Sequence, residues 1–287
     1  MESIEATLNK ANSLACGEDV PGALSVLREL SIWDYGKLLL NVPQEYPCLA
    51  AVLPRMPSDE VQRNWTGNSG TALLAQSSSF VGSLVEHFER LTGRSLKDSK
   101  ILDYGCGWGR HLRLMAAFSE PANLFGVDPW DESINICRQC GVLGHLAVSD
   151  YLPRSLPFDA IEFDLIYAYS VFTHLSEKTA QLVQRTIRSR INPDGIAAIT
   201  IRPIDYWLLH GEVLPAGETI DNLRQTHLDR GFAFAPHNRA PIEGEITYGD
   251  ASISIEYIKR NWTDWQVEAT ETAADPYQIL VFLRPIR

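Results

Sequence analysis

The stretch Ile101-Leu-Asp-Tyr-Gly-Cys-Gly-Trp-Gly-Arg110 decides the fold of this 287-residue chain. Two apolar residues, an acid and three alternating glycines predict a short buried strand that turns into a helix. Glycine adopts positive φ angles readily and lets a bound molecule lie directly against the backbone. The helix that follows presents unpaired N–H groups to that molecule. The stretch therefore predicts a ligand site at the end of a strand.

The spacing of the glycines and the position of Asp103 narrow the choice of ligand. Dinucleotide-binding turns have the spacing G-x-G-x-x-G, which cradles two phosphates, whereas the spacing in this chain is G-x-G-x-G. A carboxylate at Asp103 repels a pyrophosphate and attracts a cation. We therefore expect a ligand with an ammonium group and no phosphate, and S-adenosylmethionine fits. In these residues the chain resembles the class I S-adenosylmethionine-dependent methyltransferases.

The segments that follow repeat the order of strand, acid and helix. A second apolar strand ends at Asp128, and a third ends at Asp150. Strands alternating with helices predict a parallel, doubly wound α/β sheet that binds its ligand at the carboxyl ends of the strands. Beyond the first strand, the expected strands are 124–128, 145–149, a run beginning at 163 and 196–201, and the expected helices are 110–118, 131–140 and 177–191.

The resemblance implies a Rossmann-like fold with a seven-stranded, mostly parallel sheet whose last strand is antiparallel. A helix is expected at 252–261, and a closing hairpin at 265–270 and 277–283. The family assigns S-adenosylmethionine as the cofactor, and with it Asp103 to the ammonium, Asp128 to the ribose hydroxyls and Asp150 to the adenine amino group. The further cofactor contacts that we expect are Gly105, Cys106, Gly107, Pro129, Tyr151, Ser170 and Phe172.

Residues 1–60 are expected to form a helical appendage to the methyltransferase domain, which we assign to residues 61–287. Apolar residues recur at helical spacings between Leu8 and Leu39, and five prolines between positions 21 and 57 break the segment into short helices. Such an appendage covers the active site, forms a subunit contact such as a homodimer, or only packs on the core. The sequence leaves these alternatives open.

The polar, glycine-containing loop at 63–70 precedes a long helix expected at 71–91. It resembles a segment of some bacterial small-molecule and glycan methyltransferases that folds over the cofactor. That resemblance implies that Trp65 stacks near the methionine or the acceptor, and that Thr66 or Ser69 donates to the cofactor carboxylate. The alternative is a plain loop in which Ser69 or Thr71 caps the helix.

The segment 203–250 is too long for an ordinary connection, and long loops of this kind are usually lids or binding segments. In the resembled family an insertion at this place commonly shapes the acceptor pocket. We expect Tyr206, His210 and His237 to contact the acceptor. The alternative for the histidines is that they are solvated loop residues.

A phenol or alcohol acceptor loses a proton when it is methylated, and a histidine with a pKa near neutrality is suited to remove it. His174 is the first candidate, because it follows the strand from 163 on the loop that borders the transferred methyl group in the resembled fold. The alternative is that it contacts the start of the helix at 177. His210, His227 and His237 are further candidates, and a carboxylate acceptor needs no base.

The composition excludes several classes of function. A formal charge of −11 argues against nucleic acid as partner, since phosphate contacts need clustered lysine and arginine. No apolar run approaches the roughly 20 residues of a membrane span, and no signal-peptide pattern is seen. Five irregularly spaced cysteines predict reduced thiols and a cytoplasmic protein. Cys137-Arg-Gln-Cys140 stands alone, so we expect no metal site.

We therefore expect a cytoplasmic methyltransferase that acts on a small molecule or glycan, at oxygen rather than nitrogen. The stretch Ala168-Tyr-Ser-Val171 lacks the Asn/Asp-Pro-Pro-Tyr/Phe sequence that marks amino methylation of bases or glutamines. Two other classes stay open. A dinucleotide oxidoreductase would explain the glycines and Asp128 but not Asp103, and a non-catalytic module would bind S-adenosylmethionine without turning it over.

Overall fold

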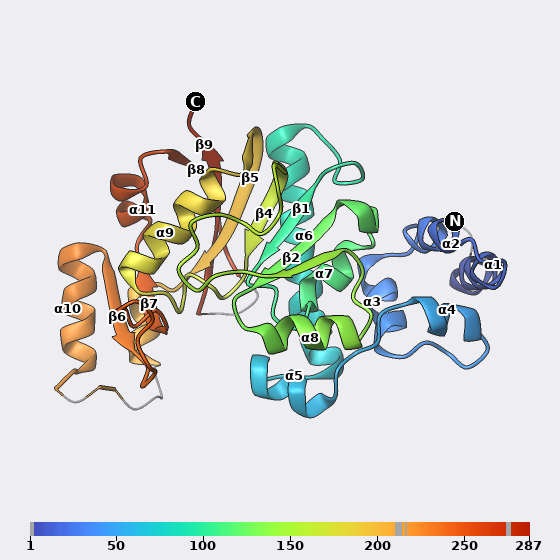
Figure 1. Ribbon diagram of the computed structural model, residues 1–287, viewed down its shortest axis with the longest axis horizontal. Coiled ribbons are helices and arrows are strands. Elements are labelled where there is room, and N and C mark those ends of the chain that lie inside the picture. The colour runs from blue at the N-terminus through green and yellow to red at the C-terminus, as the bar shows by residue number, and fades with distance from the viewer. Residues whose placement is uncertain (1–2, 210–213, 216, 274–276) are drawn as a thin grey trace.

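The computed structural model describes residues 3–209, 214–215, 217–273 and 277–287. At its centre lies a seven-stranded sheet with the strand order β3-β2-β1-β4-β5-β9-β8 (Figure 1). All its neighbouring strands are parallel except that β9 runs antiparallel to β5 and β8. This confirms the predicted Rossmann-like sheet. The strands are β1 (Ile101–Tyr104), β2 (Leu124–Asp128), β3 (His145–Val148), β4 (Phe163–Ala168), β5 (Ile191–Ile201), β8 (Trp265–Thr272) and β9 (Ile279–Pro285).

Helices cover both faces of this sheet. Neighbouring residues of β1 show why, because Ile101 and Leu102 are both fully buried but belong to two different hydrophobic cores, as the pleat of a strand requires. The Ile101 core is closed by α6 (Gly70–Thr92), α7 (Arg110–Met115) and α8 (Asp131–Gln139). The short turn η1 (Pro121–Asn123) leads into β2. The Leu102 core is closed by α9 (Glu177–Arg188) and α11 (Ile255–Asn261).

The segment before residue 60 is helical and packs on the α6 side of the sheet. Its apolar residues join the Ile101 core, and Arg28 forms an ion pair with Glu120 at 2.6 Å. The first four helices therefore pack on the core, and the fifth carries Trp65, which lies near Gly107 of the glycine turn. The five helices are α1 (Ile4–Cys16), α2 (Val20–Leu27), α3 (Ile32–Leu40), α4 (Pro47–Val52) and α5 (Asp59–Thr66).

The prediction that all five cysteines are reduced is wrong for two of them. Cys16 at the end of α1 and Cys48 in α4 form a disulfide across 32 positions of sequence. Cys106, Cys137 and Cys140 are free thiols. The pairing carries no signal in the spacing of the cysteines, because it depends on how α1 and α4 pack.

The insertion after β5 is more ordered than one long loop. It contains the turn η2 (Ile204–Leu208), α10 (Ile220–Arg230) and a two-stranded antiparallel sheet of β6 (Phe232–Pro236) and β7 (Gly249–Ile253). The prediction of a helix from 252 is therefore corrected, since α11 begins at Ile255. The reason is tertiary: N–H groups of β7 donate to the carbonyls of Thr173 and His174, which follow β4.

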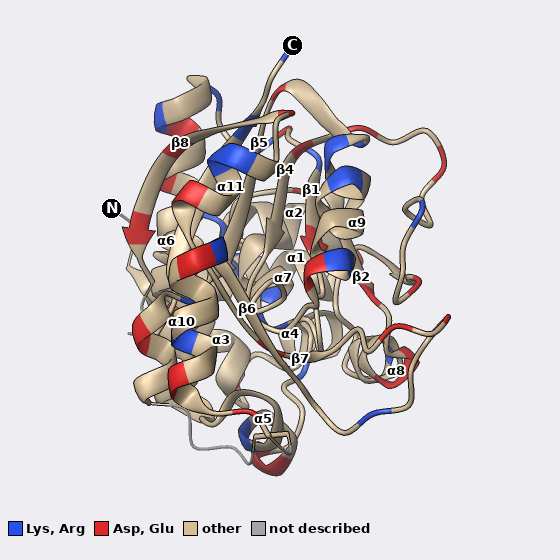
Figure 2. Ribbon diagram, turned by 90° about the vertical axis from the view of Figure 1, so that its left-hand side faces the viewer, with Lys and Arg blue, Asp and Glu red and all other residues tan. Residues whose placement is uncertain are grey.

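Charged side chains of both signs lie along α9, α10 and α11, with acidic and basic residues interspersed on each helix (Figure 2). Although the sequence has more acidic than basic residues, the surfaces of these three helices carry both. Within the described ranges, no helix combines the length and the apolar character needed to cross a membrane.

Candidate active site

The glycine-rich turn lies where β1 ends and is tied to the neighbouring strand β2. The N–H groups of Gly105 and Cys106 both donate to the carbonyl of Val127, at 2.8 and 2.9 Å. Gly105 has a φ of 75°, and a Cβ atom there would lie 2.4 Å from Cγ2 of Val171. This position therefore requires glycine. The turn presents its backbone between the ends of β1, β2 and β4.

Asp103 is buried inside β1 beside this turn. Its side chain is almost inaccessible, and its Oδ2 atom has no hydrogen-bond partner among the described residues. Burial raises the pKa of this carboxyl to about 8, while the Tyr167 hydroxyl opposes the shift and the Asp128 carboxylate adds to it. A buried carboxyl with an unused oxygen is costly in free energy. It is suited to a cationic donor that arrives with a ligand.

Asp128 ends β2 and organises the turn from the other side. Its carboxylate accepts hydrogen bonds from the N–H of Gly107 at 2.9 Å, the N–H of Trp130 at 2.9 Å and the hydroxyl of Ser133 at 3.0 Å. Burial raises its pKa, and these three donors oppose that shift. A carboxylate offers about four acceptor positions, so the three bonds leave room for one further donor.

Trp65 lies directly over the turn. Its indole ring stacks on that of Trp130, with centroids 4.8 Å apart, and a Cβ atom on Gly107 would lie 3.7 Å from the Trp65 ring. Trp130 itself is about half exposed. An aromatic cover is therefore formed by Trp65 of α5, which precedes the first strand, and by Trp130, which directly precedes α8.

Sequence reasoning missed Gln62, which shapes the loop between α5 and α6. Its side chain is buried, donates to the carbonyl of Pro57 at 2.9 Å and accepts from the N–H of Gly70 at 3.1 Å. Thr66 and Ser69 have local partners instead of facing the turn. The Thr66 hydroxyl donates to backbone carbonyls, the nearest being that of Gln62 at 2.7 Å, and the Ser69 hydroxyl accepts from Arg63 at 2.9 Å. Ser69 precedes α6 but makes no capping bond with its side chain.

The other expected cofactor residues lie at the same edge of the sheet, with one exception. Asp150 and Tyr151 are exposed after β3, and Pro129 is half-buried next to Asp128. Cys106 is buried within the turn itself.

The exception concerns the loop after β4. Ser170 has a φ of 57° and its N–H donates to the hydroxyl of Thr200 at 2.7 Å, so it stays at the end of the strand. Phe172 is fully buried and packs against Trp262, with ring centroids 5.3 Å apart. The expected contact of Phe172 with the cofactor is therefore wrong, because the turn at Ser170 directs Phe172 into the core.

A second missed residue is Arg110, which directly follows the last glycine. Its guanidinium donates to Oε1 of Gln76 at 3.1 Å and lies 4.8 Å from the ring centroid of Tyr169. This contact joins α6, α7 and the end of β4 beside Asp103. The signal was present in the sequence, because a cation at the start of this helix lies close to any ligand that the turn holds.

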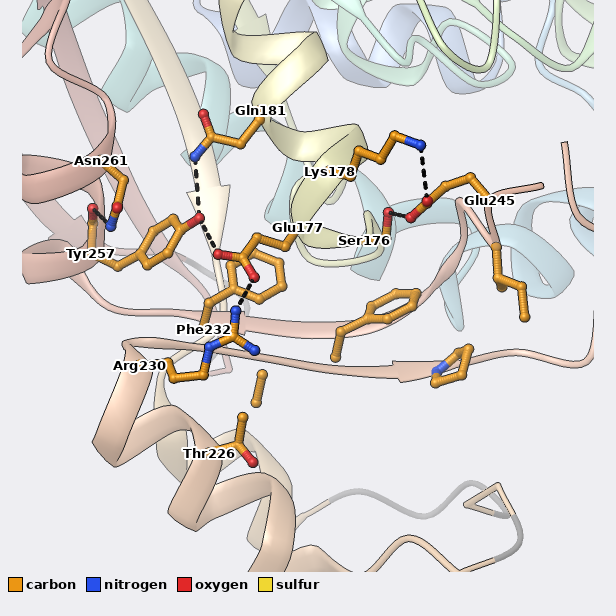
Figure 3. A pocket seen from close by; sticks show the side chains of 14 residues that line it. Ser176, Glu177, Lys178, Gln181, Thr226, Arg230, Phe232, Glu245, Tyr257 and Asn261 are labelled. Carbon is orange, nitrogen blue, oxygen red and sulfur yellow. Dashed lines mark hydrogen bonds and ion pairs between the residues drawn. The ribbon is translucent and has the colours of Figure 1, made fainter. Parts of the chain in front are cut away.

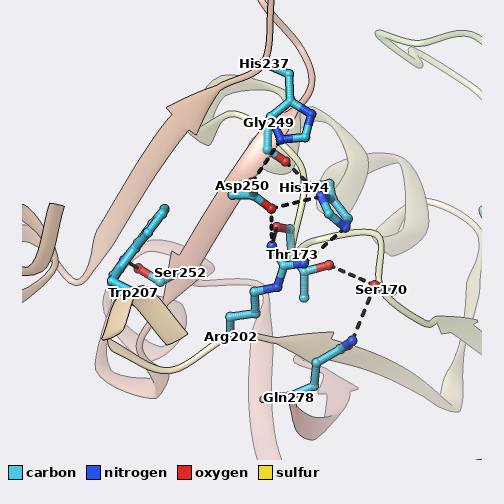
Figure 4. A network of polar contacts seen from close by, with 10 residues as sticks. All are labelled: Ser170, Thr173, His174, Arg202, Trp207, His237, Gly249, Asp250, Ser252 and Gln278. Carbon is cyan, nitrogen blue, oxygen red and sulfur yellow. Dashed lines mark hydrogen bonds and ion pairs between the residues drawn. The ribbon is translucent and has the colours of Figure 1, made fainter. Parts of the chain in front are cut away.

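A second group of polar side chains lies beyond the carboxyl ends of β4 and β5. It is a hydrogen-bonded network centred on Asp250 of β7 (Figure 4). Oδ1 of Asp250 lies 2.6 Å from Nη1 of Arg202, just after β5, and Oδ2 lies 2.9 Å from Nε2 of His237. Asp250 is buried, and Arg202 also donates to the carbonyl of Thr173 at 2.9 Å. Segments from β4, β5, β6 and β7 therefore meet at one carboxylate.

His174 belongs to this network, but both of its ring nitrogens are occupied. Nδ1 donates to the carbonyl of Gly249 at 2.8 Å, and Nε2 accepts from Arg202 at 3.3 Å. Burial and the charge of Arg202 lower its pKa to about 4, and its ring stacks on Tyr248. The expectation that His174 is the general base is therefore corrected. Its lone pair is held by a cation, so it has little affinity for a further proton.

His237 has the geometry that His174 lacks. Its Nε2–H donates to the buried carboxylate of Asp250, which places the lone pair on Nδ1. About a third of its side chain is exposed, and within the described ranges Nδ1 makes no hydrogen bond. This is the arrangement of a base oriented by a carboxylate.

The other residues of the insertion that we expected near the acceptor lie at different places in the structure. Tyr206 is half-buried with the guanidinium of Arg202 4.0 Å from its ring centroid, so it borders the network. His227 lies in α10, where burial lowers its pKa and its Nδ1 is 2.7 Å from the hydroxyl of Ser252, so it is a structural residue. His210 lies outside the described residues.

Comparisons with known proteins agree with this geometry. Residues 101–195 match the family model described as a methyltransferase domain. An uncharacterized protein of Rickettsia prowazekii is 25% identical over 128 residues, which are 41% of this chain and 48% of that protein. The chain thus spans about half the length of this curated relative.

Solved structures share the fold at low sequence identity. An S-adenosylmethionine-dependent methyltransferase of Clostridium acetobutylicum ATCC 824 has a TM-score of 0.52 and 13% identity, covering 79% of this chain and 96% of that chain. The magnesium protoporphyrin IX methyltransferase of Synechocystis PCC 6803, solved with bound S-adenosylhomocysteine, has a TM-score of 0.51 and 13% identity, covering 79% and 94%. Residues 101–195 of this chain therefore form a methyltransferase domain, and its fold is that of S-adenosylmethionine-dependent methyltransferases.

Proposed function

We propose that this chain binds S-adenosylmethionine at the carboxyl ends of β1 and β2 and transfers its methyl group to an oxygen of a small molecule or glycan. The observation that carries this proposal is the buried Oδ2 of Asp103, left without a partner among the described residues beside the glycine turn. A carboxylate in that position pairs with the ammonium of a methionine moiety. When bound, the cofactor supplies an electrophilic methyl group together with its leaving group.

The remaining residues of the edge would hold the other parts of the cofactor. Asp128 has one acceptor position left for a ribose hydroxyl, and Asp150 with Tyr151 is exposed where the adenine would lie. Trp65 would cover the turn from above. Arg110, in the first position of α7, would face the methionine carboxylate. The backbone of Cys106, Pro129 and Ser170 completes the proposed lining.

On the acceptor side, His237 would act as the general base. Its Nδ1 would take the proton of an acceptor hydroxyl, while its Nε2–H stays on Asp250. The Asp250 carboxylate would then pair with the imidazolium that forms, and Arg202 holds that carboxylate in place through a contact of 2.6 Å. Tyr206 borders this space as an acceptor contact.

A base at His237 favours a hydroxyl oxygen as the acceptor atom. A hydroxyl must lose its proton to a base, whereas a carboxylate or a neutral amine can be methylated without one. The net charge of −11 supports a partner other than nucleic acid. Association through the N-terminal helices and a cytoplasmic location stay predictions.

Calorimetry and a methylation survey would test the proposal. We expect S-adenosylhomocysteine to bind and NAD(H) not to bind. Asp128→Ala should weaken S-adenosylhomocysteine by at least about tenfold, the loss of a charge-assisted hydrogen bond of roughly 1.5–3 kcal/mol, whereas Asp131→Ala at the start of α8 should not.

Labelled S-adenosylmethionine incubated with fractionated metabolites and oligosaccharides should label at least one fraction, and the labelled products should be mainly methyl ethers of hydroxyl acceptors. Cofactor binding without transfer to any fraction would support a non-catalytic module instead. Binding of NAD(H) in preference to S-adenosylhomocysteine would remove the methyltransferase proposal.

A further inference from the structure

Arg239 lies over the ring of Tyr248 at the outer end of the Asp250 network. Its Cζ atom is 4.2 Å from the centroid of that ring, and the same ring stacks on His174 with centroids 4.9 Å apart. A contact of this kind holds the guanidinium by its charge and leaves its five N–H donors available to a ligand. Arg239 is exposed, and none of the described residues pairs with its side chain or accepts a hydrogen bond from it.

Other cations near the insertion are paired with carboxylates instead. In the groove of about 700 Å³ between α9, α10, β6 and α11 (Figure 3), Arg230 lies 2.6 Å from Glu177. At the same groove, Lys178 lies 3.3 Å from Glu245. These ion pairs occupy the cations of the groove, so we assign no ligand to it. Arg239 has no such pair within the described ranges.

The charges of the Asp250 network balance without Arg239. The carboxylate of Asp250 lies 2.6 Å from Nη1 of Arg202. Burial and the charge of Arg202 lower the pKa of His174 to about 4, so this imidazole is neutral near pH 7. His237 is neutral in the state in which it acts as a base. Arg239 therefore adds an unbalanced positive charge to this end of the site, in a chain whose formal charge is −11.

The proposed base lies beside this cation. The backbone N–H of Arg239 donates to the carbonyl of His237 at 2.8 Å, which folds the three residues into a tight turn. The rings of His237 and Tyr248 have their centroids 5.4 Å apart. Because the guanidinium contacts the same Tyr248 ring, the imidazole and the guanidinium are no farther apart than the sum of these two ring distances. One small molecule can therefore contact both groups.

Tyr248 also connects this cation to the cofactor edge. Burial raises the pKa of the Tyr248 hydroxyl, Arg239 and Arg202 oppose that shift, and Asp250 and Asp128 add to it. The proposed ribose acid and Arg239 thus act on one side chain. A ligand held between them would lie next to the cofactor.

The donors of Arg239 are best suited to an oxyanion. The planar fork of a guanidinium matches two oxygens of a carboxylate or a phosphate, and hydrogen bonds between charged groups are stronger than those to a neutral amide or hydroxyl. The overall negative charge of the chain repels anions. A cation without a carboxylate partner at the site would therefore decide whether an anionic acceptor binds.

We propose that the acceptor carries an oxyanion, a carboxylate or a phosphate, a few atoms from the hydroxyl that is methylated, and that Arg239 binds this oxyanion. The proposal rests on the proposed function, because His237 fixes where the hydroxyl lies. Hydroxy acids, uronic acids and sugar phosphates have this chemistry. Arg239 would select the acceptor without taking part in the transfer itself.

The first test measures binding to the full-length protein, with and without S-adenosylhomocysteine, and needs no turnover. The probes form two matched sets: glucuronate, glucose 6-phosphate and glucose, and 4-hydroxybenzoate, 4-hydroxyphenyl phosphate and 4-hydroxybenzamide. We expect at least one anionic probe to bind at least about tenfold more tightly than the neutral member of its set, the usual effect of a charge-assisted hydrogen bond. The carboxylate and phosphate members of a set show which oxyanion is preferred.

Two variants assign this preference to a residue. Arg239→Gln should bind the anionic probe no more tightly than its neutral counterpart. Arg90→Gln, which removes an exposed arginine from the last turn of α6, should keep the preference of the wild type. Unchanged binding of S-adenosylhomocysteine by Arg239→Gln would show that this variant is folded.

The second test uses the methylation survey. We expect the labelled products to be retained on an anion-exchange column at neutral pH. With a labelled acceptor in hand, Arg239→Gln should raise KM at least about tenfold and change kcat less than about twofold, since it removes binding of a group that does not react.

Three results would overturn the proposal. No anionic probe binds in preference to its neutral counterpart, or Arg239→Gln keeps that preference, or all labelled products of the survey are uncharged. The last result would leave the methyltransferase proposal intact. A survey without any labelled product would instead count against the proposed function, and the binding test would still decide whether Arg239 holds an oxyanion.

Discussion

The indole rings of Trp65 and Trp130 stack with their centroids 4.8 Å apart and their planes inclined by 12°. Trp65 belongs to α5, ahead of the first strand, whereas Trp130 follows β2 and Asp128. The pair therefore joins the N-terminal segment to the loop that carries the proposed ribose acid. Because Trp65 also lies against Gly107, the pair covers this part of the glycine turn.

Trp65→Ala is expected to weaken S-adenosylhomocysteine binding about two- to tenfold. The reason is that an aromatic pair contributes roughly 0.5–1.5 kcal/mol beyond the area it buries. Calorimetry would measure the affinity, and Trp33→Ala on the surface of α3 is the matched control. An unchanged affinity in Trp65→Ala would make this loop a plain connection.

Asp103 predicts that cofactor affinity depends on pH. In the ligand-free protein burial raises its pKa to about 8, so the carboxyl is protonated at neutral pH. Pairing with an ammonium requires the ionised form, and binding therefore releases a proton. We expect the Kd of S-adenosylhomocysteine to rise about tenfold for each pH unit below 8, since one proton is exchanged. Calorimetry in buffers of different ionisation enthalpy would count that proton.

The ligand-free protein should show the matching change in stability. The unfolded chain releases the Asp103 proton near pH 4, but the folded protein keeps it up to about pH 8. The contribution of Asp103 to the free energy of unfolding therefore falls as the pH rises through this interval. Asp103→Asn should remove both effects. Asp128, Arg110 and Tyr167, which face Asp103 from β2, α7 and β4, remain in this variant. A flat Kd in the wild type would contradict the assignment.

His237→Ala is expected to lower turnover of a hydroxyl acceptor by roughly 10²–10⁴-fold, the usual contribution of a general base. Asp250→Asn should also lower turnover, because the imidazole of His237 loses the carboxylate that orients it. The acceptor would be a hydroxyl compound identified by the methylation survey.

His174→Ala is the control for this assignment. It should change turnover by less than tenfold but lower the melting temperature, since Arg202 and the Gly249 carbonyl lose buried hydrogen bonds. If His174→Ala reduces turnover as strongly as His237→Ala does, the two histidines act together and the assignment of His237 as the sole base is wrong.

The disulfide predicts a redox-dependent stability. Reduction of Cys16–Cys48 should lower the free energy of unfolding by up to about 3–4 kcal/mol, because the bond closes a loop of some 33 residues in the unfolded chain. Urea titrations with and without reductant would measure this, and Cys16→Ser with Cys48→Ser should be insensitive to the reductant. Equal midpoints for the oxidised and reduced wild type would contradict the expectation.

The fold and the cofactor edge could be predicted because their signals are local. Apolar runs ending in Asp103 and Asp128 mark two parallel strands, and the carboxyl ends of parallel strands meet at one edge of the sheet. The glycines between them identify the turn by their backbone freedom alone. The number of strands and the reversed β9 followed from the resemblance to a family, whereas the strand order came from the structure.

Only the tertiary structure distinguished the two histidines proposed to face the acceptor, and only it showed which cysteines pair. His174 and His237 look alike in the sequence, yet one accepts from Arg202 and the other donates to Asp250, because β7 packs against the loop after β4. The disulfide between Cys16 and Cys48 depends in the same way on the packing of α1 against α4. The sequence by itself determined the sheet and its ligand turn, since neighbours along the chain make them. The tertiary structure decided which histidine keeps a free lone pair, since residues far apart in the chain compete for one carboxylate.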